Sequence, residues 1–343
     1  MAGMELYVST FGNDNWSGYL KEPAEDGSDG PFASLERAVI ESRKTQGINK
    51  RIIIKGGEYY DVSIKLDSSD SGLCIEGAEG ETPVLYGGIE LNNWNETEDG
   101  MWYLKLPEVQ GELWDFRGFT VNGRLCERAR YPHEGVLVNE SEFNVEWMGT
   151  TYGGWERKPT QDELTIMYYK SGDLEGIGDI YNADVTVFHS WDESFVNVKR
   201  HEPENRRLIF SKACEHPPGG FGNHSYVLWN VRKGISRPGQ WYLDKENQTV
   251  YYIPLKDEDI KSSNAFVPTT TRVIEIKGNP RNLTVKNMCI SGTDAPLMVG
   301  GFGASNVTAA IESVEGLEIV EFNLPLDNES YVRKTKNNSN WKL

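Results

Sequence analysis

The sequence predicts an all-β protein built on a parallel β-helix, a solenoid of short stacked strands, with a capping helix near the N-terminus and an inserted antiparallel β domain. Three observations lead to this fold class. Short β-rich runs bounded by Gly, Asp, Ser or Pro follow one another in residues 51–88 and again in 272–324. Longer alternating runs, including a hairpin pattern, separate the two groups. One segment has helical periodicity.

The composition is that of a folded, turn-rich protein. The chain has 343 residues, of which 38% are hydrophobic and 11% aromatic, with 35 Gly and 15 Pro. This length is sufficient for two or three domains. The formal net charge of -17 repels phosphate backbones and anionic lipid, so neither nucleic acid nor membrane is expected as a partner.

The cysteines and the N-terminus carry no special signature. Cys74, Cys126, Cys214 and Cys289 are scattered without CxxC spacing, which predicts free thiols rather than a zinc or redox motif. The first ten residues lack a basic region, an apolar run and a cleavage site, and no window resembles a membrane span. The expected location is cytoplasmic, or extracellular if a signal was removed.

Residues 1–93 predict the first coils and their cap. The run "ELYVST" (5–10) alternates as a strand, and "SLERAVIESRK" (34–44) reads as the one convincing helix, with Ser34 as N-cap and Leu35, Ala38 and Val39 on one face. Short strands are expected at 51–57, 62–66, 72–77 and 82–88. Such strands with irregular corners are typical of a parallel β-helix, in which each coil pairs with the next. An amphipathic helix before the first coil would cover the exposed end of the stack.

Residues 94–265 predict an inserted all-β domain, and residues 266–324 predict resumed coils. In the insert, "QWYLDKENQTVYYIPL" (240–255) reads as a hairpin around a polar turn. In the resumed part, "AAIESVEGLEIVEFNL" (309–324) reads as strand, corner and strand. Residues 325–343 are polar and lack this rhythm, which is typical of a tail.

Several stretches resemble a known family. Residues 6–18, 29–39, 52–60 and 70–88 match, in that order, the N-terminal pattern of right-handed parallel β-helix proteins of the pectate-lyase-like superfamily. Residues 121–132 and 237–255 are similar to the inserted β domain of the subgroup around glycoside hydrolase family 141. The resemblance covers roughly residues 5–324 and implies a right-handed β-helix with activity on glycosidic bonds.

Members of this family usually continue through further coils that bear their catalytic carboxylates. Here the polar tail follows instead, so the chain is expected to be a truncated N-terminal part, and no catalytic residue is carried over. The predicted function is that of a glycoside hydrolase-like protein acting on plant or microbial polysaccharide or oligosaccharide, inactive if the later coils are missing. Two alternatives stay open, a non-catalytic carbohydrate-binding or structural remnant and a polysaccharide lyase.

The segment "HSWDES" (189–194) is the most suggestive local cluster. His189 and Trp191 offer a titratable base and an aromatic platform for substrate binding, and Asp192 and Glu193 are weak catalytic candidates, because glycoside cleavage needs two carboxyl groups across the bond. The alternative is a solvated turn between two strands. Asp294, where a coil meets a Gly-rich loop, is a third weak catalytic candidate, with a plain corner residue as its alternative.

Further binding candidates lie elsewhere in the insert. Arg128, Arg130 and Tyr131 would suit an acidic sugar, with structural salt bridging as the alternative. Trp155 lies in an expected loop, where an aromatic ring could stack on a sugar. The two "GGFG" runs, at 219–222 and 300–303, precede neither a helix nor a Lys-Ser/Thr pair, so a phosphate loop is rejected.

No cofactor or metal is expected, since no ladder of Asp residues supports the calcium site that pectate lyases carry. The expected partner is carbohydrate. Self-association through the face of residues 309–324 is also expected, because the end of a short stack leaves unpaired strand edges and apolar surface.

Overall fold

The computed structural model describes residues 3–45, 49–107, 113–149, 154–277 and 280–292, together with the backbone of 320–323 and 331–334. Strands dominate these residues, and the all-β prediction is confirmed. The described residues contain two α-helices, α1 (Leu35–Ser42) and α2 (Gln161–Thr165), neither long and apolar enough to cross a membrane. Five single 3₁₀ turns complete this part of the chain: η1 (Ser68–Asp70), η3 (Ile180–Asn182), η4 (Pro203–Asn205), η5 (Gly220–Gly222) and η6 (Arg232–Gly234).

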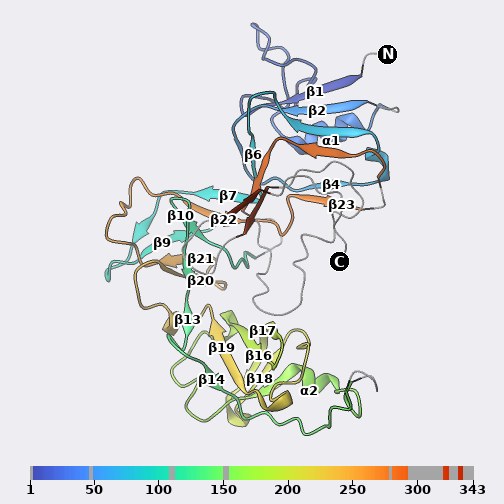
Figure 1. The fold of residues 1–343 in the computed structure, drawn as a ribbon. Helices are drawn as coiled ribbons and strands as arrows, with labels where there is room; N and C mark the ends of the chain where they lie inside the picture. The colour runs from blue at the N-terminus through green and yellow to red at the C-terminus, as the bar shows by residue number, and fades with distance from the viewer. Residues whose placement is uncertain are drawn as a thin grey trace.

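Three parallel ladders lie at the N-terminal end of the molecule, at the top of Figure 1. The first contains β1 (Met4–Val8), β2 (Lys50–Ile54), β5 (Leu73–Gly77) and β24 (Thr284–Lys286). The second contains β3 (Glu58–Tyr59), β6 (Val84–Tyr86) and β25 (Cys289–Ser291), and the third pairs β4 (Ile64–Leu66) with β23 (Ile274–Ile276). From β2 onward, successive strands belong to the first, second and third ladder in turn. The same order resumes at β23, after residues 87–273.

Side chains inside the three ladders form one hydrophobic cluster. Alternate positions of the short strands point inward, so β1, β2, β4 and β5 each contribute two buried aliphatic side chains and β6 and β24 contribute one each. The helix α1 packs its own buried face against this cluster, and the predicted N-cap is confirmed, because the Ser34 hydroxyl accepts a hydrogen bond from the Arg37 N–H. The cluster includes Leu6, Leu35, Val39, Ile52, Ile54, Ile75, Leu85 and Val285.

The chain between the two groups of parallel strands builds two further hydrophobic clusters. The first is aromatic and centres on the fully buried Trp241. It joins two sheets in which all pairs are antiparallel except β12 with β20. One sheet has the order β11 (Arg124–Leu125), β10 (Thr120–Val121), β22 (Ala265–Pro268) and β7 (Gly88–Leu91), and the other has the order β12 (Glu127–Arg128), β20 (Gln240–Asp244), β21 (Thr249–Tyr252), β9 (Trp102–Lys105) and β8 (Asn95–Glu96). The predicted hairpin is confirmed as β20 and β21.

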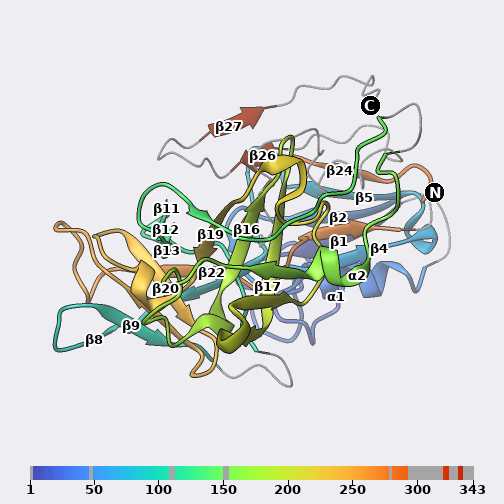
Figure 2. The same ribbon diagram turned by 90° about the horizontal axis from the view of Figure 1, so that it is seen from below.

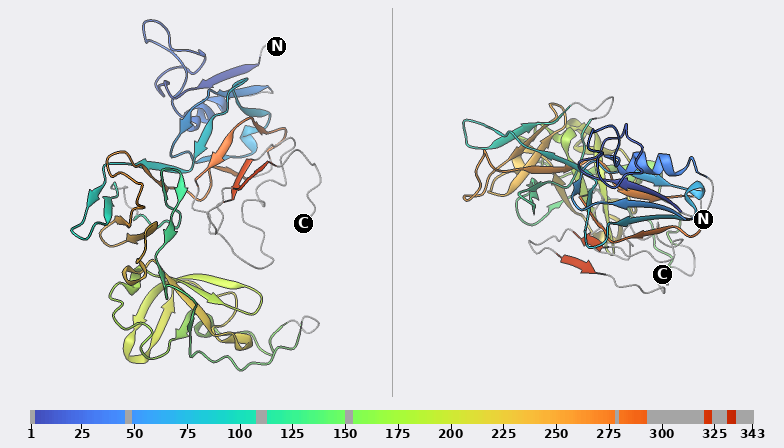
Figure 3. Two further views of the ribbon diagram at one scale, coloured as in Figure 1. Left: turned by 60° about the vertical axis from the view of Figure 1, so that its left-hand side comes forward. Right: turned by 90° about the horizontal axis from the view of Figure 1, so that it is seen from above.

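The second cluster belongs to a seven-stranded antiparallel sheet, which lies farthest from β1 in Figure 1 and in the left view of Figure 3. Its order is β13 (Arg130–Tyr131), β19 (Ser225–Trp229), β16 (Asp184–Phe188), β17 (Glu193–Glu202), β18 (Arg207–Phe210) and β15 (Ile166–Tyr168), and β14 (Leu137–Val138) also pairs with β19. Figure 2 shows this sheet from below, in front of the parallel ladders.

Two results differ from the sequence predictions. The helix α2 was not predicted. Its Thr160–Glu163 capping box is a recognisable start signal, but the helix buries none of its residues and therefore leaves no apolar stripe in the sequence. The tail was predicted without strands, yet β26 (Val320–Asn323) pairs antiparallel with β27 (Tyr331–Lys334), whose Tyr and Val are strong strand formers. Residues 309–319, 324 and Asp294 lie outside the described part of the chain, and so does the second "GGFG" run.

Candidate functional site

An open groove of about 450 Å³ lies beside the seven-stranded sheet. Its lining comes from two segments far apart in the sequence, of which the first wall consists of residues 142–147 with Trp155 and the second of residues 219–224. Its most prominent lining residues are Glu142, Phe143, Trp147, Trp155, Phe221 and His224. The volume falls in the range of about 300–1,000 Å³ typical of small-molecule sites.

A short antiparallel pairing brings two tryptophans together on the first wall. Trp147 and Trp155 form an isolated β-bridge, and the Met148 N–H donates to the Gly154 carbonyl at 2.8 Å. Directly opposed residues of an antiparallel pair project to the same side. Their rings accordingly meet edge to face, with centroids 4.9 Å apart, and the edge of Phe143 packs on Trp155 at the same distance.

Phe221 is the central ring of the groove. Its centroid lies 4.2 Å from Trp155, 4.4 Å from Trp191 and 5.2 Å from Trp147. The ring is partly exposed, as are Trp147 and Trp155, and the Trp191 side chain is 64% exposed. The groove therefore presents aromatic surface to solvent, whereas most other aromatic rings of the insert are buried in its cores.

The "GGFG" turn holds Phe221 in an unusual conformation. Phe221 has φ 56° and ψ 18°, in the left-handed region, which costs a residue with a side chain roughly 1–2 kcal/mol. Gly219 has φ 78°, and a Cβ there would lie 2.1 Å from the Ser141 carbonyl oxygen, so only glycine fits. Backbone strain of this kind concentrates at functional sites. The turn positions an aromatic ring, and no phosphate loop is formed.

The "HSWDES" segment supplies a polar cluster next to Phe221. It forms the turn between β16 and β17, closed by the His189 N–H donating to the Asp192 carbonyl at 2.8 Å. The Asp192 carboxylate lies 3.2 Å from Nδ1 of His216, and the His216 ring lies 5.8 Å from the Phe221 ring. The two side chains are in contact at this distance, but the direction of the contact falls short of a hydrogen bond. Glu193 begins β17 opposite Phe188.

His189 is buried and lies behind this turn. Its Nε2 is 2.8 Å from Oγ of Ser194, which also accepts a hydrogen bond from the Glu215 N–H. Burial lowers the pKa of His189 to about 4, although the negative charge of Asp192 opposes that shift. His189 is an internal support of the turn, with a side chain only 5% exposed.

The depressed pKa of His189 predicts a loss of stability in mild acid. As the pH falls below about 6.5, the unfolded chain takes up a proton on His189 and the folded chain does not until about pH 4. The free energy of unfolding should fall by about 2 kcal/mol between pH 6.5 and 5 from this group alone. Urea unfolding across this range should show a shallower decline for His189→Gln. The exposed His133→Gln is the control, and an unchanged slope in His189→Gln would refute the assignment.

The predicted arginines do not line the groove. Arg130 donates to the carbonyls of Pro132, His133 and Gly135, and its guanidinium lies 5.8 Å from the centre of the Trp229 ring. Tyr131 packs against the core of the seven-stranded sheet. Arg128 is buried against Asp184. The structure thus gives these three residues structural partners, and their predicted role in sugar binding has no geometric support.

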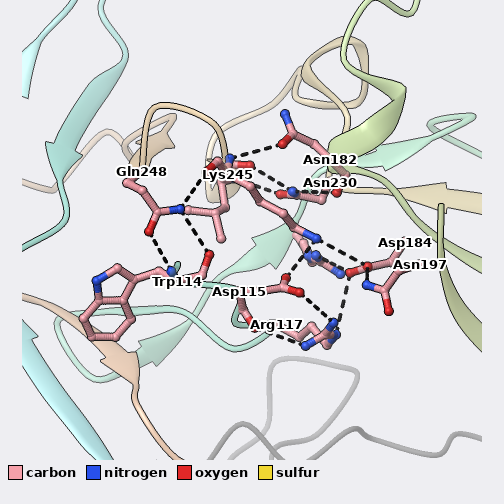
Figure 4. Close-up of polar contacts among 11 residues, drawn as sticks. Trp114, Asp115, Arg117, Asn182, Asp184, Asn197, Asn230, Lys245 and Gln248 are labelled. Atoms are coloured by element: carbon pink, nitrogen blue, oxygen red, sulfur yellow. Dashed lines mark hydrogen bonds and ion pairs between the residues drawn. The ribbon is translucent and has the colours of Figure 1, made fainter. Parts of the chain in front are cut away.

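Figure 4 shows Asp115, Arg117, Asp184 and Lys245, which belong to a charge network between the sheets of the two clusters. Arg128, on β12, belongs to the same network. Its Nη2 lies 2.5 Å from Oδ2 of Asp184, which is completely buried at the start of β16. Lys245 and Arg117 each approach Asp184 to 3.6 Å, and Lys245 also pairs with Asp115 at 2.9 Å. Burial alone would raise the pKa of Asp184, but the positive charges of Arg128, Lys245 and Arg117 outweigh it and hold the pKa below its usual value.

The sequence analysis identified Trp155 and Trp191 of this groove but not its remaining members. Phe143, Trp147, Phe221, His216 and His224 were not among the predicted residues. The paired glycines around Phe221 were a usable signal, because glycine doublets mark turns that can present a side chain. Within the described ranges, no group of three or more His, Cys, Asp and Glu side chains is arranged to hold a metal ion, and the four cysteines are free thiols.

The described residues define an all-β protein with an open groove lined by aromatic rings. No protein-family model and no curated protein matches the sequence. Among solved structures, a chain described as "Glycoside hydrolase" superposes with a TM-score of 0.63 and 21% identity, covering 85% of this chain and 51% of that one. This protein therefore spans about half the length of that neighbour, and the likeness is one of fold. A structure entitled "The complex structure of XylC with xylose" matches with a TM-score of only 0.36 and 15% identity, over 92% of this chain and 40% of the other.

Proposed function

We propose that this protein is carbohydrate-active, that its three ladders are the faces of a right-handed parallel β-helix, and that it acts on glycosidic bonds of plant or microbial polysaccharides. The observation that carries the proposal is the exposed aromatic groove around Phe221 and Trp155. A pyranose ring has an apolar face of C–H groups and a rim of hydroxyls, which suits aromatic surface flanked by a few polar groups. The sequence resemblance to the group around glycoside hydrolase family 141 and the fold of the structural neighbour support the same class.

The groove itself is better suited to holding a sugar than to cleaving one. Hydrolysis needs two carboxyl groups about 5–5.5 Å or about 6.5–9.5 Å apart across the scissile bond. Asp192 has the imidazole of His216 as its partner, and Glu142 is an exposed residue of the wall. We therefore place sugar binding at the groove and assign no catalytic role to its carboxylates. This favours, as a second candidate, a protein that binds carbohydrate without cleaving it.

Affinity gel electrophoresis of the full chain against soluble polysaccharides tests the proposal. Migration should be retarded by at least one of them, and Trp155→Ala should weaken binding about 10-fold to 100-fold, since stacking on one aromatic ring is worth about 1–3 kcal/mol. Trp155→Phe should retain most of the binding. Phe11→Ala, which removes an 82% exposed ring outside the groove, is the control.

The same polysaccharides, assayed for new reducing ends, separate the two candidates. Release of reducing ends supports a hydrolase, and retardation without release supports a binding protein. If no polysaccharide retards the protein and none is cleaved, the proposed function is wrong.

A further inference from the structure

The charges around the groove select among sugars. We propose that the groove binds uncharged pyranose residues and discriminates against uronates, the sugars whose C6 carries a carboxylate. This inference rests on the proposed function and narrows its ligand to one chemical class.

The described lining of the groove offers no lysine or arginine to receive a uronate. Recognition of a carboxylate in proteins usually relies on a free guanidinium or ammonium group, with arginine giving two parallel hydrogen bonds.

The three arginines nearest to the first wall in sequence, Arg157, Arg130 and Arg128, already have acidic or carbonyl partners. Arg157 lies over the face of Phe143 at 5.7 Å, but it donates to both carboxylate oxygens of Glu163, at 2.6 and 2.8 Å. Arg128 is committed to the buried Asp184, and Arg130 to three backbone carbonyls. Freeing any of them for a ligand would cost the contacts that they make now.

Negative charge is present instead. Glu142 is an exposed lining residue, and Asp192 lies beside His216 next to the Phe221 ring. The whole chain has a formal charge of -17, which adds a long-range repulsion of anions. One carboxylate within several ångströms of another at a protein surface weakens binding by about tenfold. An uncharged sugar avoids this repulsion and keeps the stacking on the aromatic rings.

Isothermal titration calorimetry with a matched pair of ligands tests the inference. The full chain is first titrated with neutral glucan, galactan and mannan oligosaccharides. The best ligand is then compared with its own oxidised form, in which the primary alcohols have become carboxylates. The oxidised form should bind about tenfold more weakly in 0.1 M salt. The difference should shrink in 1 M NaCl, where the Debye length falls from about 10 Å to about 3 Å.

Variants locate the effect in the groove. Glu142→Gln should tighten binding of the oxidised ligand severalfold and leave the neutral ligand unchanged, whereas Glu204→Gln, the same change at an exposed position on η4, should alter neither. Oxidised ligand that binds as tightly as the neutral form would overturn the inference while leaving the proposed function intact. If neither form of any sugar binds, both the inference and the proposed function are wrong. Neutral binding that survives in Trp155→Ala would place the ligand outside this groove and contradict the inference.

Discussion

Replacing Asp184 with alanine is expected to lower the free energy of unfolding by about 3–5 kcal/mol, because it leaves the buried Arg128 without its counter-charge. Arg128 is only 8% exposed, and the guanidinium also lies over the Trp241 ring, so it cannot turn to water without opening the aromatic cluster. The loss should be visible in urea unfolding at pH 7. Because Asp184 lies on β16 of the seven-stranded sheet and Arg128 on β12 of the five-stranded sheet, the variant should also weaken the packing between the two sheets.

Asp115→Ala is the matched control for Asp184→Ala. It removes a carboxylate from the same network, but one that is 40% exposed, so its pair with Lys245 should contribute only about 0–1 kcal/mol. If both variants lose the same free energy of unfolding, the burial of the Arg128–Asp184 pair is not the reason for its contribution to stability.

The same pair gives a prediction about acid. The pKa of Asp184 is lowered in the folded state, so its stabilising contribution is complete above the unfolded pKa of about 3.9 and is lost as the pH falls through the lower folded value. This window lies below that of His189, whose effect begins near pH 6.5. Asp184→Asn should therefore flatten only the most acidic part of the stability profile.

Substituting Gly77 with alanine is expected to cost about 3 kcal/mol, at the upper end for an added methyl group. Gly77 ends β5, where the resumed part of the chain lies directly against it. A Cβ at Gly77 would be 1.9 Å from the Asn287 carbonyl oxygen and 2.7 Å from the Pro83 ring. The backbone between β24 and β25 would have to move away, so hydrogen exchange in 284–291 should accelerate with the loss of stability.

Gly80→Ala separates this contact from a general effect of removing glycine. Gly80 has φ +77°, and a Cβ there would meet nothing within 4 Å. The change should cost only the strain of the left-handed conformation, roughly 1–2 kcal/mol, and leave exchange in 284–291 unaltered. If Gly77→Ala behaves like Gly80→Ala, the close stacking of the resumed segment on β5 is wrong.

The parts of the fold predicted from sequence are those with a local cause. Hydrophobic alternation around a polar turn predicted the hairpin of β20 and β21, and the helical spacing with Ser34 as cap predicted α1. The helix α2 was not predicted, because it buries no side chain. The division of the insert into two hydrophobic clusters was not predicted either, because it depends on which strands pair. Sequence order does not determine that β12 pairs with β20 across more than a hundred residues.

The site was only partly predictable for the same reason. Trp155 and Trp191 were predicted as binding residues because they are aromatic residues in expected loops or turns. Phe221, the ring that contacts both of them, comes from a third segment. Arg128 had a sugar-binding hypothesis because its partner, Asp184, lies on a distant strand and carries no signal of its own. A charged residue whose counter-ion is remote in sequence cannot be distinguished from a free one without the structure.

The most direct measurement of the central claim is a crystal structure of the full chain soaked with the neutral oligosaccharide that binds it. We predict density for a sugar ring stacked on Trp155 and Phe221, with its hydroxyls toward the polar side of the groove. A sugar bound instead on the parallel ladders, with the groove left as it is, would contradict the assignment of the site.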